Sequence, residues 1–197
     1  GVPVEIMCEL ANRMHVNPWF CIHHLATDAY VTGFATKVRD NLAPYLKAYV
    51  EHSNEVWNGQ YAQAVYAREV GVVKALSADP FQAQLFYHSL RSVRIFTIWE
   101  NVFGGTERFV RVMGSQAANS WVSEQALSYK NAYLRCDALG IAPYFDIVEP
   151  LKGDQATLET STVDDLLYHI EAESLPLSAK WVGQQKAMAD RFGVDLV

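Results

Sequence analysis

The segment YVEHSNEVWN, residues 49–58, carries the side chains best suited to chemistry in this sequence of 197 residues. Its first half is apolar enough to form a strand, and Asn54 and Glu55 stand where that strand would end. A carboxyl group at such a place can transfer a proton, and a neighbouring amide can bind a hydroxyl group without adding charge. The pair suits acid–base chemistry on a neutral substrate rich in hydroxyl groups.

Polar and aromatic side chains also stand at or near the ends of other apolar runs. The ends of parallel strands meet at one edge of a sheet, so these residues are expected to share a pocket. Those predicted to bind substrate beside Asn54 and Glu55 are His24, Trp57, Gln116 and Tyr144. His23 precedes His24, and adjacent residues on a strand point to opposite faces, so one of the two histidines is expected to pack within the fold.

Helices and strands must alternate along the chain to position these residues. Apolar runs bounded by turn residues predict strands at 18–24, 46–53, 109–114, 138–144 and 194–197. Helical spacing of apolar residues predicts helices at 3–14, 28–41, 61–71, 81–103, 119–133, 163–174 and 177–192, with Pro176 between the last two. This alternation specifies an α/β fold with a parallel sheet, either open and doubly wound or closed as a (β/α)₈ barrel. We expect residues 1–197 to form a single domain.

Composition and motifs narrow the function classes. The formal net charge is −6 and no cluster of Lys and Arg is present, which argues against a nucleic-acid partner. No glycine-rich phosphate loop follows a predicted strand, which disfavours nucleotide binding, and no cofactor is predicted. No apolar run approaches 18 residues, and the first residues lack the order of a signal peptide, so no membrane partner is expected. Cys8, Cys21 and Cys136 are odd in number and widely spaced, which favours three buried thiols over a disulfide or a metal site.

The Asn54–Glu55 pair resembles the Asn-Glu signature at strand four of the large clan of retaining glycoside hydrolases with (β/α)₈ barrels. The NPWF, SNEVWN, GSQ and APYF blocks are similar, more closely, to a bacterial group often labelled cellulose-binding or hydrolase-like. The resemblance implies a partial TIM barrel that acts on or binds a polysaccharide, outside the cell or in the periplasm. It implies Glu55 as general acid/base, Asn54 as partner of the sugar 2-hydroxyl group, and Tyr144 as the residue that orients the nucleophile.

The chain departs from that pattern at the second carboxylate. In the clan, the nucleophilic glutamate ends strand seven, so it is expected just beyond Val197, and strands one, two and eight are not among the predicted ones. Glu51, within a predicted strand, and Glu100, on a predicted helix, are weak replacements; Glu149 lies nearest the expected rim. We expect the chain alone to be inactive and to self-associate through exposed sheet edges.

Several alternatives remain open at the level of sequence. The chain could be a barrel relative that binds carbohydrate without catalysis, or a metal-dependent hydrolase that uses His24, His52 and Glu55. Glu55 could instead lie in the first turn of a helix, where the helix dipole favours a negative charge. Trp57 suits sugar stacking and packing equally.

Two further groups of residues are interpreted as structural and not as part of the site. The tryptophans expected in the core are Trp19, Trp99 and Trp121. The residues interpreted as a solvated helix face are Arg91, Arg94 and Glu100.

Overall fold

The computed structural model describes residues 2–145 and 154–197, and it places a five-stranded parallel sheet at the centre of the chain. The strands are β1 (Trp19–Ile22), β2 (Ala48–His52), β3 (Phe109–Gly114), β4 (Ala138–Gly140) and β5 (Asp195–Leu196). Their spatial order is their order in the sequence, and every neighbouring pair is parallel. The prediction of an α/β fold with a parallel sheet is therefore confirmed.

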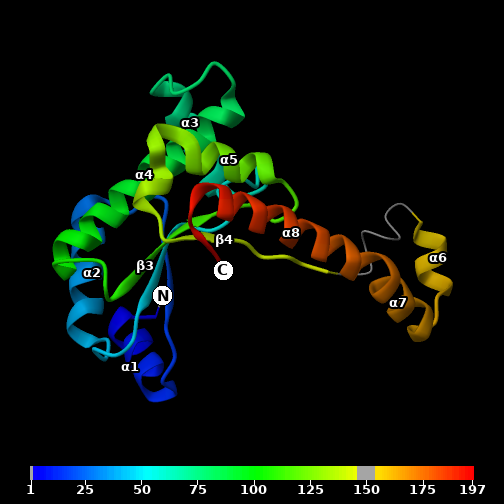
Figure 1. The fold of residues 1–197 in the computed structure, drawn as a ribbon, viewed down its shortest axis with the longest axis horizontal. Helices are drawn as coiled ribbons and strands as arrows, with labels where there is room; N and C mark the ends of the chain where they lie inside the picture. The colour runs from blue at the N-terminus through cyan, green and yellow to red at the C-terminus, as the bar shows by residue number, and fades with distance from the viewer. Residues whose placement is uncertain (1, 146–153) are drawn as a thin grey trace.

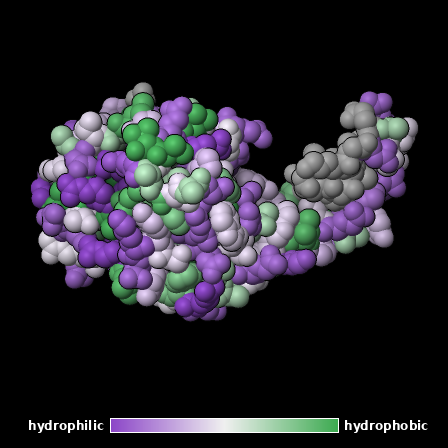
Figure 2. Space-filling view, turned by 90° about the horizontal axis from the view of Figure 1, so that it is seen from above, coloured by the Kyte–Doolittle hydropathy of each residue, from purple (hydrophilic) through white to green (hydrophobic). Residues whose placement is uncertain are grey.

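Helices connect the strands, as parallel pairing requires. The α-helices are α1 (Val4–Met14), α2 (Asp28–Asn41), α3 (Ala62–Val73), α4 (Pro80–Phe103), α5 (Ser120–Ser128), α6 (Gln155–Thr160), α7 (Val163–His169) and α8 (Leu175–Phe192). In Figure 1, α2, α4, α5 and α8 form an arc around one side of the strands. The helices α6 and α7 project away from this body, which Figure 2 shows from a second direction.

Helix α4 shows how local sequence sets these elements. The Asp79 side chain accepts a hydrogen bond from the backbone N–H of Gln82 over 2.6 Å, and Pro80 occupies the first turn. Gly104 ends the helix with a left-handed backbone (φ 74°), which glycine adopts without a steric penalty. Start and stop signals of this kind explain why the predicted boundary at Phe103 is confirmed.

The predicted elements differ from the structure at several places, and α6 was not predicted. Strand β4 ends at Gly140 instead of residue 144, and the helix expected at 119–133 changes at Tyr129 to a 3₁₀ segment that ends at Arg135. Pro176 does not separate two helices, because it lies in the first turn of α8, where its missing N–H is not needed. A π-helical segment, Ile170–Ser174, joins α7 to α8.

The two faces of the sheet have different surroundings. The face toward the helices carries the main hydrophobic core, in which Phe20, Ile22 and Val50 pack with helix residues such as Phe96 and Trp99. The opposite face, which we call the open face, carries the alternate strand residues. Its residues include Trp19, Cys21, Glu51, Gly114 and Gly140.

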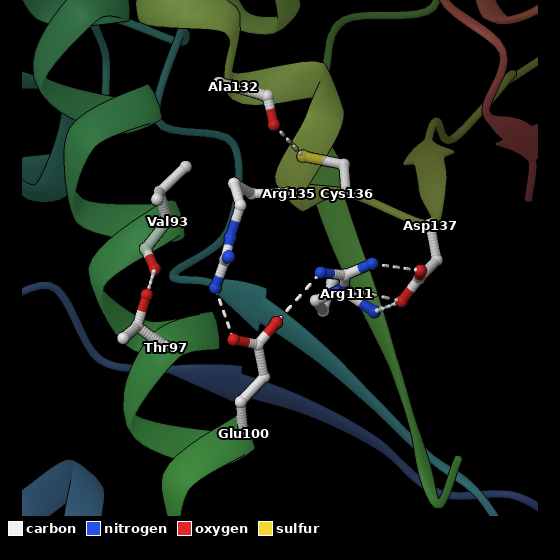
Figure 3. A network of polar contacts seen from close by, with 8 residues as sticks. All are labelled: Val93, Thr97, Glu100, Arg111, Ala132, Arg135, Cys136 and Asp137. Carbon is white, nitrogen blue, oxygen red and sulfur yellow. Dashed lines mark hydrogen bonds and ion pairs between the residues drawn. The ribbon is translucent and has the colours of Figure 1, made fainter. Parts of the chain in front are cut away.

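A paired charge cluster lies between the helix-facing side of the sheet and α4 (Figure 3). Glu100 accepts hydrogen bonds from Arg111 over 2.9 Å and from Arg135, and Arg111 also binds Asp137 through two nitrogens over 2.6 and 2.9 Å. Burial alone would raise the pKa of Asp137, but the bonds from Arg111 outweigh it and lower that pKa. We call Glu100, Arg111, Arg135 and Asp137 the charge cluster.

The interpretation of Arg91, Arg94 and Glu100 as a solvated face is therefore wrong for Arg91 and Glu100, which are largely buried, and holds for Arg94, whose side chain is 55% exposed. Glu100 belongs to the charge cluster, and both arginines form ion pairs with Asp28, at 2.5 and 2.8 Å. The α4 helix is packed by other elements over most of its surface, so its charged residues find partners in them.

Core predictions for aromatic and sulfur side chains are correct in part. Trp99 is fully buried, whereas Trp19 and Trp121 are about two-fifths exposed, so the prediction fails for both. Cys8 and Cys136 are buried free thiols, but Cys21 is an exposed free thiol, because it faces the open side of β1. Among the described residues, none of the helices combines the length and apolarity that a membrane crossing requires.

Candidate functional site

Glu55 lies in the loop that follows β2, and the backbone of this loop is unusual. Ser53 and Glu55 both have left-handed conformations, with φ of 59° and 46°. Such a backbone costs a residue with a side chain about 1–3 kcal/mol and persists only where neighbouring contacts hold it. The prediction of Glu55 at the end of this strand is confirmed, and Glu55 is not within a helix.

Buried polar groups fix the Glu55 loop. Val56 is fully buried in a small core with Ala67 and Tyr87, and its carbonyl accepts a 2.6 Å hydrogen bond from the buried side chain of Gln84. The Gln63 side chain donates to the carbonyl of Asn54 over 2.7 Å. These contacts hold the loop on both sides of Glu55, so its carboxyl group has a defined position.

Two adjoining cavities, of about 460 and 300 Å³, lie in front of this loop, and we call them together the Glu55 groove. Both are lined by Glu55, Trp57, Ser115, Ala142 and Tyr144. Further residues line one of the two, namely Trp19, Glu51, Asn54, Tyr61, Gln116 and Trp181. The structure thus brings together five of the six predicted site residues: Asn54, Glu55, Trp57, Gln116 and Tyr144.

The Glu55 carboxyl group accepts a hydrogen bond from the Asn58 side chain over 2.9 Å. Trp57 and Tyr144 are the aromatic residues that border both parts of the groove, and Tyr144 is 69% exposed. Flat aromatic rings pack well on the C–H faces of sugar rings, while carboxyl and amide groups bind hydroxyl groups. The arrangement suits a flat, hydroxylated ligand.

The loop after β3 forms another wall of the groove, and α8 holds it in place. The fully buried Gln185 donates from its side-chain amide to the carbonyls of Gln116 and Ala117, over 2.8 and 3.0 Å. Its side-chain oxygen accepts from Ser123, whose hydroxyl group lies 2.6 Å from that of Ser115. Gln185 was not predicted as part of the site, because a single amide on a helix gives no sign of its distant partner.

Glu51 is the second carboxyl group in the groove, and from the sequence it was considered only as a weak replacement for the nucleophile. It is 7% exposed, and its Oε2 atom accepts a 2.9 Å hydrogen bond from the indole of Trp19. The Cys21 thiol lies 3.8 Å from the same oxygen. Burial raises the pKa of Glu51 to about 7, although both donors act in the opposite direction. A charged residue inside an otherwise apolar strand was the available signal that this face meets a cavity.

His24 does not line the Glu55 groove. β1 ends at Ile22, and the rings of His23 and His24 lie with their centroids 4.2 Å apart instead of on opposite faces of a strand. His24 borders a separate cavity of about 470 Å³ with Tyr87 and Arg91. The alternation rule failed here because both histidines follow the end of the strand.

The metal alternative gains no support. His52 is buried against His88, with 3.0 Å between their Nδ1 atoms, and His88 Nε2 lies 3.1 Å from the Gly114 carbonyl. That carbonyl only accepts, so His88 carries its proton on Nε2, and His52 donates to its Nδ1. Burial lowers the pKa of both rings, to about 4 for His88. Within residues 2–145 and 154–197, no group of three His, Cys, Asp or Glu side chains is arranged to hold a metal ion.

Glu149, the other carboxylate considered near this rim, lies outside the described residues. No family model, curated protein or solved structure matches the chain. The features that bear on the class of protein are therefore the parallel sheet and the groove at the carboxyl ends of its strands. The resemblance to retaining glycoside hydrolases stays a prediction.

Proposed function

We propose that the Glu55 groove is a carbohydrate site of a glycoside hydrolase-like protein, with Glu55 as general acid/base and Asn54 as a partner of sugar hydroxyl groups. The observation that carries this proposal is the convergence of Asn54, Glu55, Trp57, Gln116 and Tyr144 on one groove. These residues come from loops after three different strands, as expected where βα loops build a site.

The strand order supports a barrel-like framework for this function. Consecutive parallel strands lie side by side without reversal of direction along the sheet, whereas a doubly wound sheet has a switch point where the order reverses. Right-handed crossovers between such strands put the helices on one face. We propose that this sheet is part of a (β/α)₈ barrel and that a nucleophilic carboxylate would complete a retaining mechanism.

Binding without hydrolysis is the second candidate function. The Glu55 carboxyl group is held by the Asn58 amide, and a fixed acceptor of this kind also suits a sugar hydroxyl group. Under this alternative, the aromatic residues bind the sugar and Glu55 transfers no proton.

The test is to measure binding of cellotetraose, xylotetraose and laminaritetraose by calorimetry, together with release of reducing ends. We expect one of them to bind, and Trp57→Ala to weaken that binding by about tenfold or more, which corresponds to about 1.4 kcal/mol. Trp121→Ala is the matched control, because Trp121 is a partly exposed tryptophan that lies outside the groove.

Glu55→Gln separates the two candidates. Hydrolysis that Glu55→Gln abolishes while binding persists would support the hydrolase. Because the retaining mechanism needs a second carboxylate, hydrolysis is measured with added azide or formate as a substitute nucleophile. Binding in both proteins with no hydrolysis in either would then favour the second candidate. Absence of binding by all three oligosaccharides would contradict the proposal.

A further inference from the structure

Glu51 lies on the open face at the base of the Glu55 groove, and its two carboxyl oxygens have different surroundings. Both neighbouring donors, the Trp19 indole and the Cys21 thiol, approach Oε2. None of the hydrogen bonds between described residues uses Oε1. A side chain that is more than nine-tenths buried and lines the groove therefore keeps one oxygen without a hydrogen-bond partner among the described residues.

Glycine at position 114 makes the space for this oxygen. A Cβ atom on Gly114 would lie 2.2 Å from Oε1 of Glu51, closer than any van der Waals contact. Gly140 pairs with Gly114 in the sheet register, and a Cβ there would lie 2.7 Å from Val112 and 3.3 Å from the Trp19 ring. Two paired glycines thus leave room for the Glu51 carboxyl group and for the indole that binds it.

The charges around Glu51 favour its neutral form. From β1 it faces the Cys21 thiol; although the residue is exposed, partial shielding of its sulfur from solvent and the nearby Glu51 raise the pKa of this thiol to about 12. The cavity that Glu51 lines is also bordered by Glu55 and Tyr144 from the loops and by Gly140 from β4, and Val112 of β3 lies opposite Glu51 in the sheet. No ion pair among the described residues includes Glu51. A buried carboxyl group without a cation keeps its proton more strongly than an exposed one.

The hydrogen bonds also fix where that proton resides. Oε2 accepts from an N–H and lies near an S–H, so it is the carbonyl-like oxygen of the acid. The proton therefore belongs on Oε1, the oxygen that has no hydrogen-bond partner among the described residues. A protonated carboxyl group in this position is a hydrogen-bond donor.

We propose that Glu51 is a ligand-binding residue of the Glu55 groove and that its protonated Oε1 donates a hydrogen bond to a ring or glycosidic oxygen of a neutral oligosaccharide. This inference rests on the function proposed above and adds the kind of ligand. Ligands with carboxylate groups are disfavoured, because Glu51 becomes negative as the pH rises.

The experiment combines a direct titration with binding. Carboxyl-¹³C-labelled glutamate gives an NMR signal for Glu51, which Glu51→Gln identifies by its disappearance, and we expect it to titrate near pH 7. The affinity of the wild type for the best of the three tetrasaccharides should fall about 2- to 10-fold between pH 6 and pH 8.5, as expected for the loss of one hydrogen bond.

Variants at the same position isolate the donor. Glu51→Gln places an amide donor there at every pH, so it should keep the affinity measured at pH 6 and lose the pH dependence. Glu51→Met should bind about 2- to 10-fold more weakly at pH 6. Glu9→Gln is the control, because it removes an exposed carboxyl group outside the groove and should keep both the affinity and its pH dependence.

The outcomes distinguish this inference from the proposed function. A Glu51 signal that titrates below pH 5, or an unchanged pH dependence in Glu51→Gln, overturns the role of Glu51 while sugar binding stands. No binding of any tetrasaccharide at any pH overturns the proposed function, and the ligand role of Glu51 with it. If Glu51→Met does not fold, the titration and Glu51→Gln still decide.

Discussion

Glu51 and Glu100 are both largely buried glutamates that lie on opposite faces of the same sheet, and they meet opposite surroundings. Glu100, on the helix-facing side, binds Arg111 and Arg135 within the charge cluster. Glu51, on the open face, has an indole and a thiol as neighbours and no cation among the described residues. The first acid is neutralised by ion pairs, whereas the second is neutral when it keeps its proton.

The difference indicates which face is built for a ligand. An ion-paired carboxylate has its acceptor sites occupied, so it contributes to the packing of α4 against the sheet. An unpaired acid with one free oxygen has a hydrogen-bonding site left for another molecule. The contrast therefore separates a structural side of the sheet from a side available for binding.

Removal of the central cation of the charge cluster should have the largest effect. Arg111→Met leaves Glu100 and Asp137 as partly buried charges, so the free energy of unfolding should fall by about 3–5 kcal/mol in urea titrations. Arg13→Met, which breaks the exposed pair with Glu9, should change it by less than about 1 kcal/mol. A loss below about 1 kcal/mol for Arg111→Met would show that the cluster does not stabilise the helix-facing side.

Replacement of Glu51 should have the next largest effect on the free energy of unfolding. Its pH dependence is opposite to that of most carboxyl groups, which stabilise a protein more as the pH rises. Because the pKa of Glu51 rises from 4.5 to about 7 on folding, the folded state binds its proton more strongly. Its contribution is fully present below pH 4.5 and is lost as the pH rises to about 7, which corresponds to roughly 3 kcal/mol. The unfolding free energy of the wild type minus that of Glu51→Gln should fall by this amount.

This difference must be measured against the variant, because His88 acts in the opposite direction over nearly the same range. Burial lowers the pKa of His88 from 6.5 to about 4, so its contribution is lost as the pH falls through that range. The two effects oppose each other in the wild type. In Glu51→Gln, stability should rise with pH between about 4 and 6.5, and a flat profile there would contradict the role given to His88. A difference between wild type and variant that does not change with pH would contradict the assignment of Glu51.

A smaller effect should follow from closing the space around Glu51. Gly114→Ala places a methyl group against Oε1, so it should cost about 1–3 kcal/mol of stability by overpacking. The cost should shrink in a Glu51→Ala background, because the clashing atoms are gone. Gly33→Ala is the control, since a Cβ at that helical position meets no atom within 4 Å and should not destabilise the fold. Equal costs in both backgrounds would show that Gly114 serves the backbone alone.

The sequence predicted the elements well where the local pattern carries the information. The limits of 28–41 and 109–114 are confirmed, because caps, helical spacing and a short apolar run specify them. It predicted less well which side chains face inward: Trp19 and Cys21 were assigned to the core as apolar residues. A strand with one face on helices and the other on a groove has apolar residues on both, so composition does not distinguish them.

The sequence predicted the site residues that follow strands, but it did not predict the residues that hold their loops in place. Asn54, Glu55 and Gln116 follow strands and reach the groove, as the rule for parallel sheets requires. Gln84 and Gln185 hold the two loops through contacts with residues 28 and 69 positions away, which local patterns do not encode. The role of Glu51 depends on its neighbours across the sheet, so it emerged only from the structure.

The sequential strand order also has a consequence for how the chain acquires its structure. Each strand pairs with the one that precedes it, so every new strand finds its partner already synthesised. A ribosome extends a chain at about 5–20 residues per second, and short segments close contacts far faster than that. The sheet can therefore assemble strand by strand from β1 during translation, without waiting for the carboxyl-terminal residues to emerge.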